Sequence, residues 1–155
     1  MSATGDTDFD FNDVVIDVKY GSPAKIKIMA AGGTLPLRIC ENDSWEVHEL
    51  FHVDQDFMVN TNAPAKGLKG NSDRDIDPVE LTLDINVNSA ADAKNIIIEV
   101  QKNGVWQEMT AEQGEPAAKI AVETTYDWLD ERTSIKAEHE TFVEWATNNS
   151  NIKWW

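Results

Sequence analysis

The chain has 155 residues, of which 41% are apolar and 26% charged, the composition of a single globular domain. Its 13 Lys and Arg stand against 28 Asp and Glu, and a net charge of −15 repels nucleic-acid phosphates and anionic lipid while attracting cations. The single cysteine, Cys40, excludes an internal disulfide and a cysteine-rich zinc site, and no apolar run is long enough for membrane insertion.

The start of the chain differs from a natural leader. The first five residues have neither a basic start nor an apolar stretch, so they do not form a signal peptide. A dense acidic motif begins already at residue 6, which is abrupt for a natural domain. We therefore expect residues 1–155 to be one domain and a fragment of a longer protein.

Three strands are expected in the first quarter of the chain. Residues 14–20 and 25–31 flank a Gly-Ser-Pro-Ala turn, which predicts a hairpin. The alternation at residues 35–39 predicts a third strand, and its Pro36 fits best on a sheet edge because proline cannot donate to a β-ladder.

Strand patterns continue after a long expected loop at residues 60–78, which is rich in Asn, Gly, Pro and Asp. Apolar and polar side chains alternate over residues 81–87, which predicts a strand with one buried face. Residues 96–102 lead through Asn103-Gly104, a strong hairpin signal, into residues 105–108. Together these patterns predict a mostly β fold, a β-sandwich or jelly-roll-like domain with a short C-terminal helix.

The C-terminal helix is expected to begin at Ser134, a residue type that caps helices. Ile135, His139, Phe142 and Ala146 would then share one face. Four of the six tryptophans follow residue 127, and we interpret them as bulky core anchors under this helix. The alternative is that exposed tryptophans form a platform for stacking sugars, as in a carbohydrate-binding module.

The string DTDFDFND near the N-terminus is the most informative motif. It concentrates oxygen-bearing side chains, the ligands that Ca²⁺ prefers, at Asp6, Asp8, Asp10, Asn12 and Asp13. An EF-hand loop would continue with Gly and Glu where this chain has Phe11 and Asp17, so the motif is not an EF-hand. The motif predicts a calcium site of another kind, in which Phe9 and Phe11 anchor the loop. The alternative is a solvated acidic loop whose side chains bond to nearby backbone.

The passage TGDTDFDFNDVVIDVKY resembles the opening signature of the bacterial LruC-type domain, a domain of unknown function found toward the C-terminus of exported proteins. The resemblance continues at residues 31–37, 46–51, 58–61, 114–116, 128–135, Phe142 and Trp145. It implies a mostly β domain of an exported, cell-envelope or secreted protein, with the acidic string as its cation site and no assigned reaction. Two features depart from the family: the residues that usually lead into the acidic string are missing, and His52 stands where a small residue is expected.

His52 completes a competing motif, His48-Glu49-Leu50-Phe51-His52, which matches the zinc-protease pattern H-E-x-x-H. On a helix both imidazoles could bind one Zn²⁺ while Glu49 acts as general base. The Gly and third His of the long metzincin form are missing downstream; Glu80 could serve as a third ligand, but it stands in no recognisable companion motif. The apolar pattern around His48 and His52 is also not that of a long helix. We expect a turn or short helix here, with His48 hydrogen-bonded and His52 on the surface.

Other patterns are weaker. Asp73, Asp75 and Asp77 repeat the alternate spacing and predict a solvated acidic loop, with a second cation site as the alternative. No Ser motif or basic neighbourhood of Cys40 indicates nucleophilic catalysis. The sequence therefore predicts a non-enzymatic calcium-binding domain with a structural or adhesive role, whose partner is an unknown protein or glycan and neither nucleic acid nor membrane.

Overall fold

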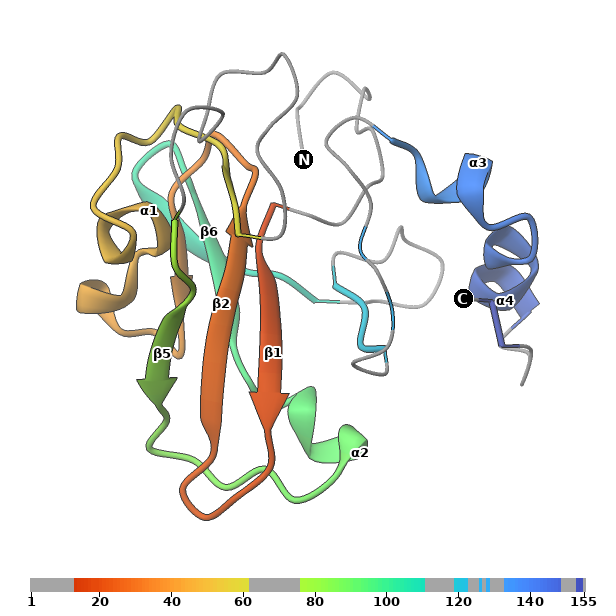
Figure 1. Cartoon of the computed structure of the whole chain (residues 1–155), viewed down its shortest axis with the longest axis horizontal. Helices are drawn as coiled ribbons and strands as arrows, with labels where there is room; N and C mark the ends of the chain where they lie inside the picture. Colours follow the sequence, from red (N-terminus) through yellow and green to blue (C-terminus); the bar gives the residue numbers. More distant parts are fainter. Residues whose placement is uncertain are drawn as a thin grey trace.

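Two antiparallel β-sheets form the centre of the molecule, as the strand patterns predict (Figure 1). The computed structural model describes residues 13–61, 76–110, 119–122, 126, 128, 133–148 and 153–154. None of the helices in these ranges has the length and apolar character needed to cross a bilayer.

The first sheet is built around β2 (Lys25–Ala31), which pairs with β1 (Val15–Lys19) in the predicted hairpin. Alternate residues of β2 are buried, so one face of the strand lies on the core. A bulge interrupts the ladder between Val15 and Ile16, directly after the point where the acidic string enters the sheet.

Two short strands share the other edge of β2. β4 (Val59–Asn60) pairs with its end, and β5 (Val79–Thr82) pairs with its beginning, both antiparallel. Thr61 continues β4 by donating its N–H to Met29 O at 3.1 Å. β4 and β5 therefore lie along the same edge of β2.

The alternation predicted for residues 81–87 is present in the burial pattern, because Leu83 and Val87 are fully buried. The regular strand nevertheless ends at Thr82. Ala24 O accepts from Leu83 N, whereas Ala24 N donates to Ile85 O, so the ladder skips a residue there. The pairing resumes as a single bridge between Gly21 and Val87.

The second sheet has the order β3 (Leu37–Ile39), β6 (Ile98–Lys102) and β7 (Val105–Glu108). β3 is an edge strand, and Pro36 lies just before it, as expected. The predicted turn joins β6 to β7: Asn103 and Gly104 both have positive φ, 52° and 77°, which is the geometry of a type I′ hairpin turn.

A single hydrophobic core joins the two sheets, and β6 lies behind β2 in Figure 1. Ile26 and Ile28 from the first sheet pack with Leu37, Ile39 and Ile98 from the second. Burying a side chain of this size stabilises the fold by roughly 1.5–3 kcal/mol. This sandwich-like core fixes the strands that carry the candidate site.

Short helical segments lie between the strands in the chain. The 3₁₀ turn η1 (Asp43–Trp45) and the one-turn helix α1 (Val47–Leu50) follow β3, and α2 (Ala90–Ala93) precedes β6. Further along the chain, Lys119 Nζ donates to the carbonyls of Lys94 and Ile96 at 3.2 and 3.3 Å, just after α2.

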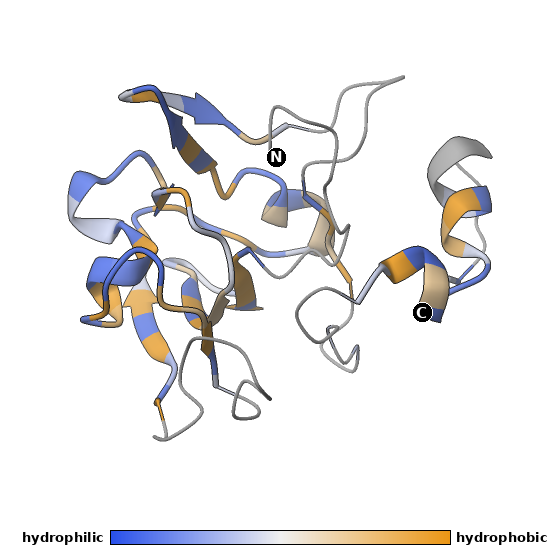
Figure 2. Ribbon diagram, turned by 90° about the horizontal axis from the view of Figure 1, so that it is seen from above, coloured by the Kyte–Doolittle hydropathy of each residue, from blue (hydrophilic) through white to orange (hydrophobic). Residues whose placement is uncertain are grey.

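The C-terminal segment forms two short helices instead of the single helix expected from Ser134. α3 (Ile135–Glu138) ends at His139, which has non-helical φ and ψ of −125° and 89°, and α4 (Phe142–Asn148) follows. Figures 1 and 2 place both helices to one side of the sheets. They surround a second apolar cluster of Ile135, Phe142 and Trp154.

Candidate functional site

The predicted calcium ligands fall mainly outside the described residues. Asp6, Asp8, Asp10 and Asn12 lie outside them, and Asp13 is the one member of the predicted set that the structure describes. Within the described ranges, no three His, Cys, Asp or Glu side chains are grouped to hold a metal ion. The five-residue site therefore remains a prediction, and Asp13 shows how its last member is attached.

Asp13 is fixed to the end of β2. Its carbonyl oxygen accepts hydrogen bonds from the N–H groups of Gly32 at 3.2 Å and Gly33 at 3.5 Å. A Cβ atom on Gly33 would lie 2.8 Å from Asp13 Oδ1, closer than real Cβ atoms come to other atoms, and 3.2 Å from its Cγ, which is a tight contact. The glycine thus leaves room for the carboxylate, which is exposed to solvent.

The second acidic segment enters the sheet from the same end. β1 and β5 run parallel to one another on opposite sides of β2, so about 10 Å, two strand spacings, separates them. Asp13 lies two residues before β1 and Asp77 two residues before β5, and both are exposed. Asp73 and Asp75 lie outside the described residues.

The helix that the zinc-protease alternative requires does not extend over its two histidines. α1 ends at Leu50, and His52 adopts a left-handed backbone with φ of 55°. His48 is 1% exposed, whereas His52 is exposed to solvent. The two imidazoles are thus not neighbours on one helix face, and the short helix and surface His52 expected from the sequence are present.

His48 belongs instead to a buried polar cluster with Glu46 and Gln55. Its Nδ1 lies 3.3 Å from Glu46 Oε1 and 3.0 Å from Gln55 Nε2, so Nδ1 donates to the carboxylate or accepts from the amide, one at a time. Among the described residues its buried Nε2 has no hydrogen-bond partner.

Glu46 ties α1 to β3, because its carboxylate accepts from the backbone N–H groups of Glu49 at 2.8 Å and Leu37 at 3.2 Å. Burial alone would raise the pKa of Glu46, but the bonds from His48, Glu49 and Leu37 outweigh it and lower the pKa. Glu46 belongs to none of the candidate sites that the sequence motifs predict. Its position just before a helical turn was the available signal, since acceptor side chains favour that place.

Cys40 lies partly buried at the end of β3. Burial raises the pKa of its thiol, which disfavours the nucleophilic thiolate. Cys40 and Glu41 both have positive φ, 53° and 55°, and form a tight turn that Asn42 N closes on Ile39 O at 3.2 Å. Cys40 thus belongs to a tight turn. Among the described residues, its thiol has no catalytic partner.

The described tryptophans are buried or partly buried, which does not favour sugar stacking. Trp154 is 3% exposed and packs edge-to-face on Phe142, with ring centroids 4.9 Å apart. The remaining tryptophans of the described part are partly buried: Trp45, Trp106, Trp128 and Trp145. Trp106 is covered by the Arg38 guanidinium, 4.5 Å from the ring centroid. Trp145 and Trp154 belong to the apolar cluster at α3 and α4, as the core anchors expected from the sequence, and Trp45 packs against the main core. Trp155 lies outside the described residues.

Comparison with known proteins gives no family assignment. No protein family, curated protein or solved structure matches this chain. Candidate functions therefore depend on the residues and their geometry.

Proposed function

We propose that the chain is a non-enzymatic calcium-binding domain with a structural or adhesive role in a bacterial cell-envelope or secreted protein. The observation that carries the proposal is the attachment of Asp13: its carbonyl is bonded to Gly32 and Gly33, and its carboxylate occupies the space that a side chain at Gly33 would fill. The acidic string thus ends at a residue that is hydrogen-bonded to the end of the sheet, which supports a role for it as a ligand-bearing loop.

The physical reason for a cation is mutual repulsion. Asp6, Asp8, Asp10 and Asp13 are four carboxylates within eight residues of a chain whose net charge is already −15. Ca²⁺ takes 6–8 oxygen ligands at about 2.3–2.6 Å, so one ion can bring several of these carboxylates together. A cation bound there would stabilise the first hairpin, because an ion that binds the native state alone stabilises that state.

The location outside the cell and the adhesive role come from the resemblance to the LruC-type domain. Extracellular calcium is abundant enough to occupy sites with dissociation constants of about 10⁻⁴–10⁻³ M. A structural calcium site of modest affinity is consistent with such an environment. The partner would be a protein or a glycan.

The test is thermal unfolding in millimolar CaCl₂ and in chelator, with NaCl added so that the ionic strengths are equal. We expect a higher melting temperature in calcium, by several degrees. The double substitution Asp8→Asn with Asp10→Asn should abolish this difference, and Gly33→Ala should reduce it because the added methyl group displaces the Asp13 carboxylate.

The matched control is Asp84→Asn with Glu138→Gln, which removes the same charge from exposed positions elsewhere. It should retain the full effect of calcium. Identical melting curves of the unsubstituted chain in calcium and in chelator would refute the proposal. An equal loss in the control would reduce the effect to general charge screening.

A further inference from the structure

An open groove lies between the turn after α1 and the segment that leads into β5. Its volume is about 510 Å³, and it is lined by residues 50–53 on one side and 76–79 on the other. Most of the lining is apolar, and Leu50, Val53 and Val79 also pack against the main core without being buried by it. The groove thus exposes apolar side chains at the edge of the main core, and no described side chain covers them.

The strand beside this groove has an edge available for pairing. Within the described ranges β5 pairs with β2 alone. Leu83 N donates to Ala24 O, and hydrogen-bonded positions alternate along an antiparallel ladder, so Val79 and Leu81 also direct their backbone groups toward β2. The N–H and C=O groups of Glu80 therefore point away from β2. An edge of this kind is a template for a further strand.

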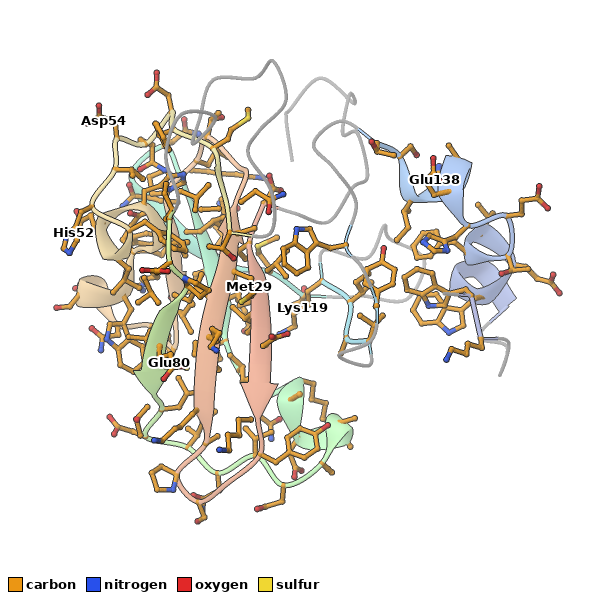
Figure 3. All side chains as sticks on the ribbon, viewed as in Figure 1. Met29, His52, Asp54, Glu80, Lys119 and Glu138 are labelled. Atoms are coloured by element: carbon orange, nitrogen blue, oxygen red, sulfur yellow. The ribbon has the colours of Figure 1, made fainter. Side chains whose placement is uncertain are left out.

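The rim of the groove is acidic. Asp77 lines the groove, and the exposed residues Glu49, Asp54 and Glu80 each adjoin a lining residue in the sequence. On the adjacent strand β2, Lys27 pairs with Glu80 at 3.3 Å, and Lys25 stands opposite Thr82. Figure 3 shows His52, Asp54 and Glu80 on the same side of the molecule, opposite Glu138. The field at this groove favours a basic ligand.

We propose that this groove binds an extended segment of a partner protein in which Lys or Arg alternates with apolar residues, added as a strand along β5. Successive side chains of a strand point to opposite faces. The apolar set can enter the groove beside Val79, while the basic set lies on the opposite face of the strand beside Glu80. Asp77 lies in the groove lining two residues before Val79, where a basic residue at one end of the segment can reach it. Backbone pairing and alternating side-chain pockets are the usual components of strand addition.

A second copy of this chain fits the groove less well. Each copy carries a net charge of −15, so two acidic surfaces would meet at an acidic rim. A basic segment of a different protein gains from the same field. This interface is separate from the proposed calcium ligands, and its failure would leave the calcium proposal intact.

The test uses fluorescence anisotropy with the labelled peptide acetyl-(Lys-Val)₄-amide and the intact chain in calcium buffer. We expect saturable binding of this peptide. A copy in which every backbone nitrogen is methylated keeps the charges and valines but cannot donate hydrogen bonds, and it should bind at least about tenfold more weakly. Acetyl-(Lys-Ser)₄-amide, which lacks apolar side chains, should be weakened by a similar factor.

Matched protein variants locate the site. Asp77→Lys reverses an exposed charge at the groove and should weaken binding several-fold, whereas Glu138→Lys makes the same change on α3 and should have an effect below about twofold. Absence of saturable binding, including absence because another part of the chain fills the groove, would overturn the proposal. Equal binding of the methylated peptide, or equal weakening by the two variants, would also overturn it.

Discussion

Glu46 is a carboxylate held inside the protein by hydrogen bonds and without a lysine or arginine beside it among the described contacts. Glu46 is 7% exposed. Its carboxylate accepts hydrogen bonds from two backbone N–H groups and, when His48 Nδ1 carries a proton directed at it, from the imidazole of His48. Donors that bond to the charged form of a carboxylate favour that form. The link between α1 and β3 therefore depends on the ionised state of this side chain.

The stability contributed by Glu46 should fall in acid. Because its native pKa is below the unfolded value, the unfolded chain takes up the proton first, and the stabilisation is complete above the unfolded pKa of about 4.3. It is lost as the pH falls through the native pKa. Glu46→Gln should cost about 1 kcal/mol at pH 7 and progressively less below pH about 4.5.

Urea unfolding from pH 7 to pH 3 measures this difference directly. Glu49→Gln, a change at an exposed side chain of the same helix, is the matched control. A difference between Glu46→Gln and the unsubstituted chain that stays constant over the whole range would contradict the ionic role of Glu46.

Two serines occupy the N-cap positions of short helices, and they differ in what their hydroxyls do. Ser89 at the start of α2 accepts a hydrogen bond from Asp92 N at 3.3 Å, while the Asp92 carboxylate accepts from Asn88 N at 3.0 Å. Ser134 precedes α3 without a side-chain cap bond. We expect Ser89→Ala to destabilise the fold by about 1 kcal/mol and Ser134→Ala by much less.

Chemical unfolding of the two variants under identical conditions provides the comparison. Each serine is replaced by the same residue at the same helix position, so intrinsic propensity largely cancels. Equal costs for the two substitutions would mean that the Ser89 hydroxyl does not stabilise α2.

The strands could be predicted from sequence because period-two burial and turn chemistry are local properties. The Asn103-Gly104 turn and the hairpin of β1 and β2 are confirmed. The prediction of a single helix from Ser134 is wrong, because the helix breaks at His139. We attribute this break to packing, since the centroid of the His139 ring lies 5.6 Å from that of Tyr126 and 5.3 Å from that of Trp154. Contacts so distant in sequence leave no periodic signal.

The sequence predicts which kinds of ligand the candidate site contains, but it does not predict where in the fold these ligands are anchored. The string of Asp residues indicates oxygen ligands, but the anchoring of Asp13 on Gly32 and Gly33 comes from the pairing of β1 with β2. Likewise, the approach of Asp77 to the same sheet end follows from β5 pairing along β2, about 50 residues away in sequence. Such pairings depend on the whole core.

The molecule as a whole carries far more negative than positive charge, and the described ion pairs neutralise little of it. Arg38 is shared between Glu99, at 2.5 Å, and Asp43, and Lys27 pairs with Glu80. Most other carboxylates of the described surface are exposed. Self-repulsion of this kind destabilises a compact state relative to an expanded one.

Monovalent salt should therefore stabilise the fold in the absence of any specific ion. Raising NaCl from 10 mM to 0.15 M shortens the Debye length from about 30 Å to about 8 Å, which screens the repulsion between distant carboxylates. A gain of about 1 kcal/mol would raise the melting temperature by about 2–4 °C for a chain of this size. Calorimetry in chelator, over this range of NaCl, measures the effect separately from calcium.

The charge-reversal pair Asp84→Lys with Glu138→Lys supplies the control, because both positions are exposed and together they raise the net charge by four units. Its melting temperature should rise less steeply with NaCl than that of the unsubstituted chain. Identical slopes would show that salt acts through hydration and not through repulsion. A steeper rise with millimolar calcium than with NaCl of equal ionic strength would then measure the part of the stabilisation that a general ionic atmosphere cannot provide. That part is the one expected from the acidic string that ends at Asp13.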